Sequence, residues 1–166
     1  MVKKTAYSRD NIFKLLSAIP DPEIPVITIR ELGVLRDVRM EGDAVVIDIT
    51  PTYSGCPAMK MIEDQIREEM DKAGISKFRI NLVYSPAWTT DWMTEEAKEK
   101  LRAFGIAPPE KTSSDKNVLM GKKKIIACPR CGSTRTEMVS QFGSTACKAL
   151  YKCLDCHEPF DYFKCI

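Results

Sequence analysis

Apolar residues recur at helical and strand spacing along the first part of the chain. Ser8 can cap a helix whose apolar stripe falls at positions i, i+3, i+4 and i+7, namely Ile12, Leu15, Leu16 and Ile19. Two segments with strand character, 34–40 and 44–50, flank a short connection at 41–43 that contains a glycine. The pattern predicts a helix followed by a hairpin of two antiparallel strands.

The best-defined predicted element is a second helix that follows the hairpin. Its apolar positions recur at three- and four-residue steps and are Met59, Ile62, Ile66, Met70 and Ala73. Cys56 is the predicted N-cap, because Pro57 stands where proline most readily begins a helix, and Gly74 closes the helix as its C′ residue. Alternation over 78–82 then predicts a third strand beside the other two. The predicted fold class is α+β, with a small three-stranded mixed sheet packed with helices.

The residue pattern after the third strand predicts a loop, then a helix, then a linker. Trp88 and Trp92 lie in the loop at 83–93, where they either pack over the sheet or form a partner-binding patch, and we favour packing. A helix is expected over 94–104, and the prolines and serines of 106–121 are typical of a linker. The expected domains are 1–106, a linker at 107–123, and a second domain at 124–166.

Two Cys-x-x-Cys pairs near the end of the chain predict a metal site. They are separated by 21 residues, close to the spacing of a zinc ribbon, and consist of Cys128, Cys131, Cys153 and Cys156. Four thiolates complete a closed tetrahedral shell, so the expected role is structural. The same thiolates serve iron–sulfur clusters, and we favour zinc. A segment of this size buries too little surface to fold unaided, so metal binding should supply much of its folding free energy.

Three other residues near the ribbon have less defined roles. His157 follows the second cysteine pair and is expected to be an exposed neighbour of the metal site, and Cys165 is expected to have no essential role. Cys147 ends a loop of small residues, 143–147, that we expect to project from the ribbon. It is either a filler of the loop or a second thiol that could approach Cys56.

Cys56 and the acidic turn at 21–25 each have a structural and a functional interpretation. A thiol at a helix N-terminus faces unpaired N–H groups and the positive end of the helix dipole, which favour the thiolate. Cys56 could equally be an inert, buried cap. The three prolines of 20–25 exclude a helix there, so Asp21 and Glu23 lie on a stiff turn, and we expect them to cap the following turn at 27–32.

Charge and hydropathy limit the classes of protein to which the chain can belong. The 166 residues carry a formal charge of +2. Residues 121–166 contain eight Lys or Arg and four Asp or Glu, a modest surplus that includes the lysine run at 122–124. No apolar run has membrane-spanning length and no apolar segment follows the first lysines, so we expect a cytoplasmic protein whose cysteines bind metal. No Ser/His/Asp set or phosphate-binding loop is visible, so ordinary catalysis is not expected.

Several motifs resemble those of a known family. The chain resembles the MIP18 (DUF59) family of iron–sulfur assembly factors in the segments Asp21 to Pro25, Glu31 to Leu35 and Thr50 to Pro57. It is similar to the PaaD subgroup in two further segments, Pro86 to Met93 and Phe142 to Leu150. The likeness covers nearly all of the chain except the N-terminal tail and the region near 108–122.

The resemblance implies a site and a role. It implies that Glu23, with Asp21 and Thr52, lines the same site as Cys56, and that a transient iron–sulfur cluster engages Cys56. The resemblance also implies that the protein is a maturation factor without catalysis of its own. Its implied partners are cluster donors or clients, chiefly components of the phenylacetyl-CoA epoxidase complex. The reductase of that complex carries a cluster. The alternatives are a zinc-ribbon scaffold or nucleic-acid module, which the modest charge disfavours, and a thiol enzyme. The sequence leaves open whether the chain forms a homodimer.

Overall fold

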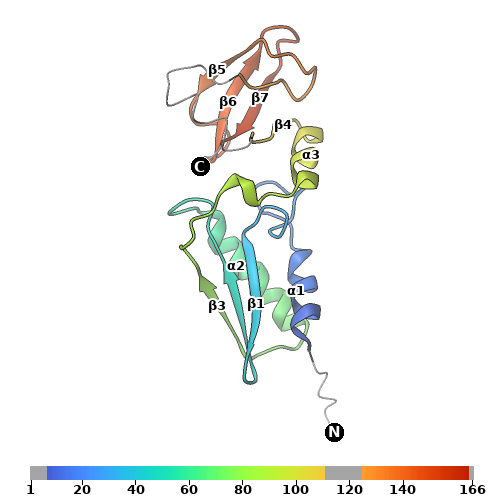
Figure 1. Cartoon of the computed structure of the whole chain (residues 1–166), viewed down its shortest axis with the longest axis vertical. Helices are drawn as coiled ribbons and strands as arrows, with labels where there is room; N and C mark the ends of the chain where they lie inside the picture. The colour runs from blue at the N-terminus through green and yellow to red at the C-terminus, as the bar shows by residue number, and fades with distance from the viewer. Residues whose placement is uncertain (1–6, 111–124, 165–166) are drawn as a thin grey trace. The chain divides into compact units, whose positions relative to one another are not determined.

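The computed structural model describes residues 7–110 and 125–164, which form two compact units that divide between Trp88 and Thr89 (Figure 1). The first unit begins with helix α1 (Arg9–Ser17), which starts as predicted with Ser8 as its N-cap, its hydroxyl accepting the Asn11 N–H at 3.2 Å. The other elements of this unit are β1 (Leu35–Glu41), β2 (Ala44–Ile49), α2 (Ala58–Lys72) and β3 (Phe78–Leu82).

The first sheet has the order β1-β2-β3 and is mixed, as predicted. Strands β1 and β2 form the antiparallel hairpin, whereas β3 lies parallel to β2 after the crossover through α2. The parallel pair requires a long connection, and α2 provides it while covering one face of the sheet (Figure 1). Gly74 follows α2 with φ of +72°, the left-handed conformation expected of a C′ glycine.

The core of the first unit lies where the helices meet the sheet. Side chains with essentially no exposure come from α1, the α1–β1 segment, the strands and α2, among them Ile12, Leu16, Ile27, Leu35, Ile47, Ile49, Ile62 and Ile66. Burial of each such side chain contributes about 1.5–3 kcal/mol. Central strand β2 also carries the buried carboxylate of Asp48, which accepts hydrogen bonds from Arg39 of β1 and, at 2.9 Å, from Asn81 of β3.

The second unit contains a four-stranded sheet with the order β4-β7-β6-β5. It starts with the 3₁₀ turn η1 (Thr90–Trp92) and helix α3 (Glu95–Ala103), and its strands are β4 (Ile106–Ala107), β5 (Thr136–Ser140), β6 (Lys148–Cys153) and β7 (Pro159–Phe163). The sequence predicts a boundary at residue 106. The compact units divide between Trp88 and Thr89, and in the second unit β4 pairs in parallel with β7. Most of the expected linker at 107–123 lies outside the described residues.

Trp88 is buried in the first unit, as the packing interpretation predicts. Its exposed fraction is 4%, and its indole N–H donates to the carbonyl of Leu32 at 2.9 Å. Trp92 is half-buried in the second unit. None of the helices in the described part of the chain has the length and apolar character that a membrane crossing requires.

Replacing Trp88 with phenylalanine should destabilise the first unit by about 1–3 kcal/mol, because the buried carbonyl of Leu32 loses its donor. Urea unfolding followed by circular dichroism measures this difference. The control is Tyr84→Phe, since Tyr84 is 61% exposed and its variant should unfold at the wild-type urea concentration. Equal stability of all three proteins would show that the indole hydrogen bond contributes nothing to the fold.

Candidate functional site

The register of the first sheet brings three connections to one of its ends. Ile49, the last residue of β2, pairs with Leu35, the first of β1, and with Leu82, the last of β3. The segment that enters β1, the loop that leaves β2 and the loop that leaves β3 therefore meet at this end. Backbone hydrogen bonds of 2.9 Å confirm it, from Thr50 to Val34 and from Val83 to Ile49.

Cys56 lies in the loop that leaves β2 at this end. Its thiol is free and the residue is half-buried, so Cys56 is not the buried residue of the inert interpretation. The predicted N-cap is wrong by one residue, because Pro57 is the N-cap of α2 and makes no side-chain capping bond. The carbonyl of Cys56 accepts the N–H of Met59 at 3.2 Å, so Cys56 directly precedes the helix.

Asp21 lies in the segment that enters β1 and is 4% exposed. Its carboxylate oxygen Oδ1 accepts the N–H groups of Glu23 at 2.9 Å and Ile24 at 2.8 Å. Asp21 therefore caps its own turn, whereas the sequence analysis expected it to cap the turn at 27–32.

That following turn is closed by a different pair of residues. Thr28 accepts the N–H of Glu31 at 3.1 Å, and Glu31 accepts the N–H of Thr28 at 2.8 Å. This reciprocal pair is a capping box, which the spacing Thr-x-x-Glu in the sequence could have predicted. Glu23 is half-buried.

Thr50 and Thr52 follow β2 and are both buried. Thr52 was expected beside Cys56, and the structure places the two in the same loop, four residues apart. The hydroxyl oxygen of Thr50 is buried and has no hydrogen-bond partner among the described residues. Nothing in the sequence signals an unpaired hydroxyl at Thr50, which stands there only as part of a family motif.

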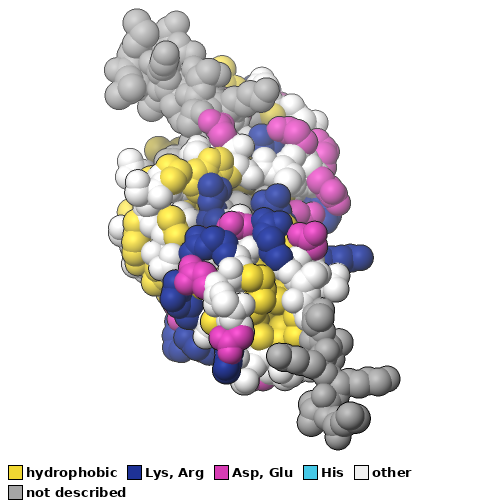
Figure 2. Space-filling model, turned by 60° about the horizontal axis from the view of Figure 1, so that its bottom comes forward, with side chains coloured by type: hydrophobic (Ala, Val, Ile, Leu, Met, Phe, Trp, Pro, Cys, Tyr) yellow, Lys and Arg dark blue, Asp and Glu magenta, His cyan; other side chains and the backbone are white. Residues whose placement is uncertain are grey.

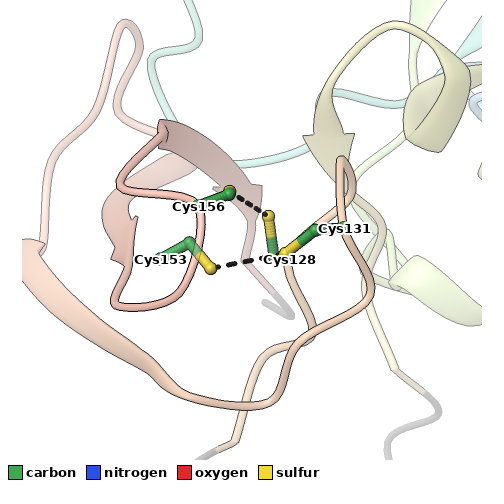
Figure 3. A group of neighbouring side chains, drawn as sticks. All are labelled: Cys128, Cys131, Cys153 and Cys156. Carbon is green, nitrogen blue, oxygen red and sulfur yellow. Dashed lines mark hydrogen bonds between the residues drawn. The ribbon is translucent and has the colours of Figure 1, made fainter.

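The ribbon cysteines form one cluster, as predicted (Figure 3). The sulfur atoms of Cys128, Cys131, Cys153 and Cys156 lie within 4.8 Å of one another. The separation is 3.8 Å between Cys128 and Cys156 and 3.5 Å between Cys131 and Cys153. A tetrahedron of sulfurs around zinc at about 2.3 Å has edges of about 3.8 Å, so the cluster fits a four-coordinate ion. Such an ion, when bound, joins the turn before β5 to the turn after β6.

The pKa values of the cluster thiols differ widely. Backbone N–H groups of Cys156 and Asp155 lower the pKa of Cys153 to about 6, against the opposing effect of burial. A backbone hydrogen bond at Ser133 acts to lower the pKa of Cys131, but the neighbouring thiol of Cys153 and burial raise it to about 12. Hydrogen bonds among the thiols thus favour ionisation of Cys153 and oppose ionisation of Cys131. A metal needs its cysteine ligands as thiolates, and a bound divalent cation stabilises their negative charge.

The remaining predicted residues lie outside the metal cluster. His157 is exposed, as expected, and has a positive φ of 61° in the turn after Cys156. Cys147 does not project into solvent. It is 4% exposed, its sulfur lies 3.0 Å from the hydroxyl of Thr145, and its carbonyl accepts the Lys164 N–H at 3.0 Å. Cys165 and the lysine run at 122–124 lie outside the described residues.

Comparisons with known proteins agree with this two-part organisation. Residues 9–75 match the family model of an iron-sulfur cluster assembly protein, and residues 112–164 match the PaaD zinc beta ribbon domain. A crystal structure of a domain of unknown function, DUF59, from Bacillus anthracis covers 56% of this chain and 90% of its own, with a TM-score of 0.52 and 27% identity. The first unit therefore has a DUF59-type fold, followed by a four-cysteine ribbon.

Two curated relatives define the family. A putative 1,2-phenylacetyl-CoA epoxidase component of Escherichia coli (strain K12) is 53% identical over 155 residues, which are 93% of this chain and 92% of that protein. An Fe-S protein maturation auxiliary factor of Porphyromonas gingivalis is 32% identical over 96 residues, 57% of this chain and 90% of that protein. The chain belongs to the PaaD subgroup of the MIP18 (DUF59) family of iron–sulfur assembly factors, which carries a C-terminal zinc ribbon.

Replacing Asp21 with alanine should cost about 1–2 kcal/mol of stability, because the N–H groups of Glu23 and Ile24 lose their acceptor. Asp21→Asn keeps an acceptor oxygen and should retain most of the stability. Urea unfolding of the three proteins measures both effects. An alanine variant as stable as the wild type would rule out capping as the role of this carboxylate.

Replacing Cys128 with serine should release the metal and unfold the ribbon strands while the first unit stays folded. Metal quantification together with hydrogen exchange of the two units tests this, and Cys147→Ser is the matched control because Cys147 lies outside the cluster. Acidification should release the metal as well, since the ligands must be deprotonated. Retention of a full equivalent of metal by the Cys128 variant would contradict the assignment.

Proposed function

We propose that the protein is an accessory factor for iron–sulfur cluster maturation that serves a phenylacetyl-CoA epoxidase system in aerobic phenylacetate breakdown. One observation carries the proposal most directly: the free, half-buried thiol of Cys56 at the sheet end where three connections meet, inside the region that matches the assembly-protein family. The names of the relatives support both the maturation role and the epoxidase system. The expected location is the cytoplasm.

In this proposal iron or a cluster is cargo, and the protein holds it only transiently. The Cys56 thiolate engages the iron, because thiolates are the usual ligands of iron–sulfur clusters. The loop between β2 and α2 leaves Cys56 half-buried, and Asp21 keeps its own turn in shape through two backbone bonds. Glu23 and Thr52 are proposed to line the site. No catalytic turnover by this chain is required.

The ribbon is proposed to have a separate, structural role. Its four thiolates enclose one ion on all sides, and a closed shell leaves no open position for a substrate. We propose zinc as that ion. The metal then holds together a unit that presents surfaces to other proteins, while the cargo is handled by Cys56.

Nucleic-acid binding by the ribbon has less support than a protein partner. Arg130 pairs with Glu158 at 2.6 Å and Arg135 with Asp155 at 2.7 Å, so both guanidinium groups are already matched by carboxylates. Lys148 is buried. Figure 2 brings the bottom of Figure 1, chiefly the first unit, to the front, and there Lys and Arg side chains lie among Asp and Glu side chains. Nucleic-acid sites instead gather positive charge on one surface.

Replacing Cys56 with alanine should abolish iron binding after anaerobic loading and leave about one zinc per chain and the unfolding midpoint unchanged. The reason is that Cys56 lies outside the metal cluster and its residue is half-buried, before the N-cap of α2. Iron and zinc quantification on the purified protein, with Cys147→Ser as the control, provides the measurement. Iron binding by the Cys56 variant at the wild-type level would contradict the proposed function. A full cluster content of the epoxidase reductase in a strain carrying this variant would contradict it as well.

A further inference from the structure

Strand β3 forms an edge of the first sheet and pairs with β2 alone among the described strands (Figure 1). The N–H of Val83, just after β3, donates to the carbonyl of Ile49 in β2 at 2.9 Å. Because successive residues of a strand direct their backbone groups to opposite sides, the odd-numbered residues of β3 face β2. The N–H and C=O groups of Phe78, Ile80 and Leu82 therefore face the free edge.

The other edge strands of the described sheets are less open to an added strand. Strands β1 and β5 each contain a register shift, and β4 has two residues. The Val38 carbonyl of β1 also accepts a hydrogen bond from Nε of Arg9 at 2.9 Å. By contrast, β3 keeps a regular register over all five of its residues and contains no proline. Bulges, shortness and covered backbone groups protect edges, and β3 has none of these features.

The apolar side chains of β3 are only partly covered. Phe78, Ile80 and Leu82 are in register with three β2 residues that are at most 2% exposed. Residues in register lie on the same face of a sheet, so these β3 side chains continue the apolar row of β2. Phe78 and Ile80 are nevertheless half-buried, and Leu82 is 38% exposed. A strand added at this edge would cover the row.

The sequence of β3 is complementary to itself when two copies run antiparallel about Ile80. Ile80 then lies opposite its own counterpart and Phe78 lies opposite Leu82, so apolar side chains meet on one face. On the other face Arg79 lies opposite Asn81, so like charges do not meet. The residues that meet as apolar pairs are those whose backbone groups face the free edge. Each of these pairs can therefore exchange both of its N–H···O bonds.

We propose that two copies of this chain associate through β3 and join their first sheets into one continuous sheet. The contact is isologous, with a two-fold axis between the two Ile80 residues. Because the paired strands run in opposite directions, the two loops that contain Cys56 leave the joined sheet at opposite ends, each beside its own Leu82. Four residues at about 3.4 Å each separate the two Leu82 positions along the strands, on the order of 14 Å. Each Cys56 therefore binds its cargo alone, without the second Cys56.

The first test measures self-association of the full-length protein, loaded with zinc, by analytical ultracentrifugation over a series of concentrations. The wild type should show an equilibrium between monomer and dimer. Leu82→Lys should weaken dimerisation at least about tenfold, because a charged side chain within the apolar row opposes pairing at a strand edge. Met40→Lys is the matched control and should dimerise like the wild type, since Met40 is 43% exposed on β1, the opposite edge of the same sheet.

The second test fixes the register by disulfide cross-linking in a Cys56→Ala background. Ile80→Cys should give a disulfide-linked dimer after oxidation with diamide, because residues opposite each other in an antiparallel pair have Cα atoms about 5.5 Å apart. Leu82→Cys is the matched control on the same strand and should give no such dimer, since its counterpart lies beyond the reach of a disulfide. Mass spectrometry of the peptides identifies the bridge.

The outcomes decide this inference separately from the proposed function. A wild type that sediments as a monomer at every concentration overturns it, as do equal effects of Leu82→Lys and Met40→Lys. A bridge at residue 82 and none at residue 80 overturns it as well. Zinc content and unfolding midpoint of Leu82→Lys should match those of the wild type. Iron bound per chain should be unchanged in Leu82→Lys, whereas Cys56→Ala should lose iron and still dimerise, so failure of one proposal leaves the other measurable.

Discussion

The pairing of β2 with both of its neighbours is the constraint on which the candidate site depends. Because Ile49 pairs with the first residue of β1 and the last residue of β3, the three flanking connections must open at the same end of the sheet. A shift of one residue in either register would turn the buried side chains of β2 toward the opposite face. The end of the sheet from which the Cys56 loop leaves thus follows from the strand pairing of the first unit.

The two sets of cysteines are adapted to different tasks by their surroundings. The four ribbon sulfurs lie close enough to bind one ion, and the pKa values of Cys131 and Cys153 are shifted in opposite directions. A closed shell of four thiolates is typical of a structural metal site. Cys56 lies outside that cluster, on a loop between a buried strand and a helix, and its thiol is free.

Local sequence signals predicted much of the fold and the metal site. The 3.6-residue stripe after Ser8, the hairpin around Gly42 and the two Cys-x-x-Cys pairs each depend on residues close in sequence, and the structure has all three. Contacts between distant residues could not be read in this way. Cys147 was expected in a projecting loop, but Asp161, far along the chain, holds that loop to the sheet and Cys147 is buried. The pairing of β4 with β7 is equally long-range.

The most direct test of the account is to map which thiols iron protects. The zinc-loaded protein is alkylated before and after anaerobic iron loading, and the rate at each cysteine is followed by mass spectrometry. The account predicts that iron loading slows alkylation of Cys56 strongly, while the four ribbon cysteines, already bound to zinc, react slowly in both states. Iron that binds without changing the rate at Cys56, or that protects the ribbon cysteines in place of it, would contradict the central claim.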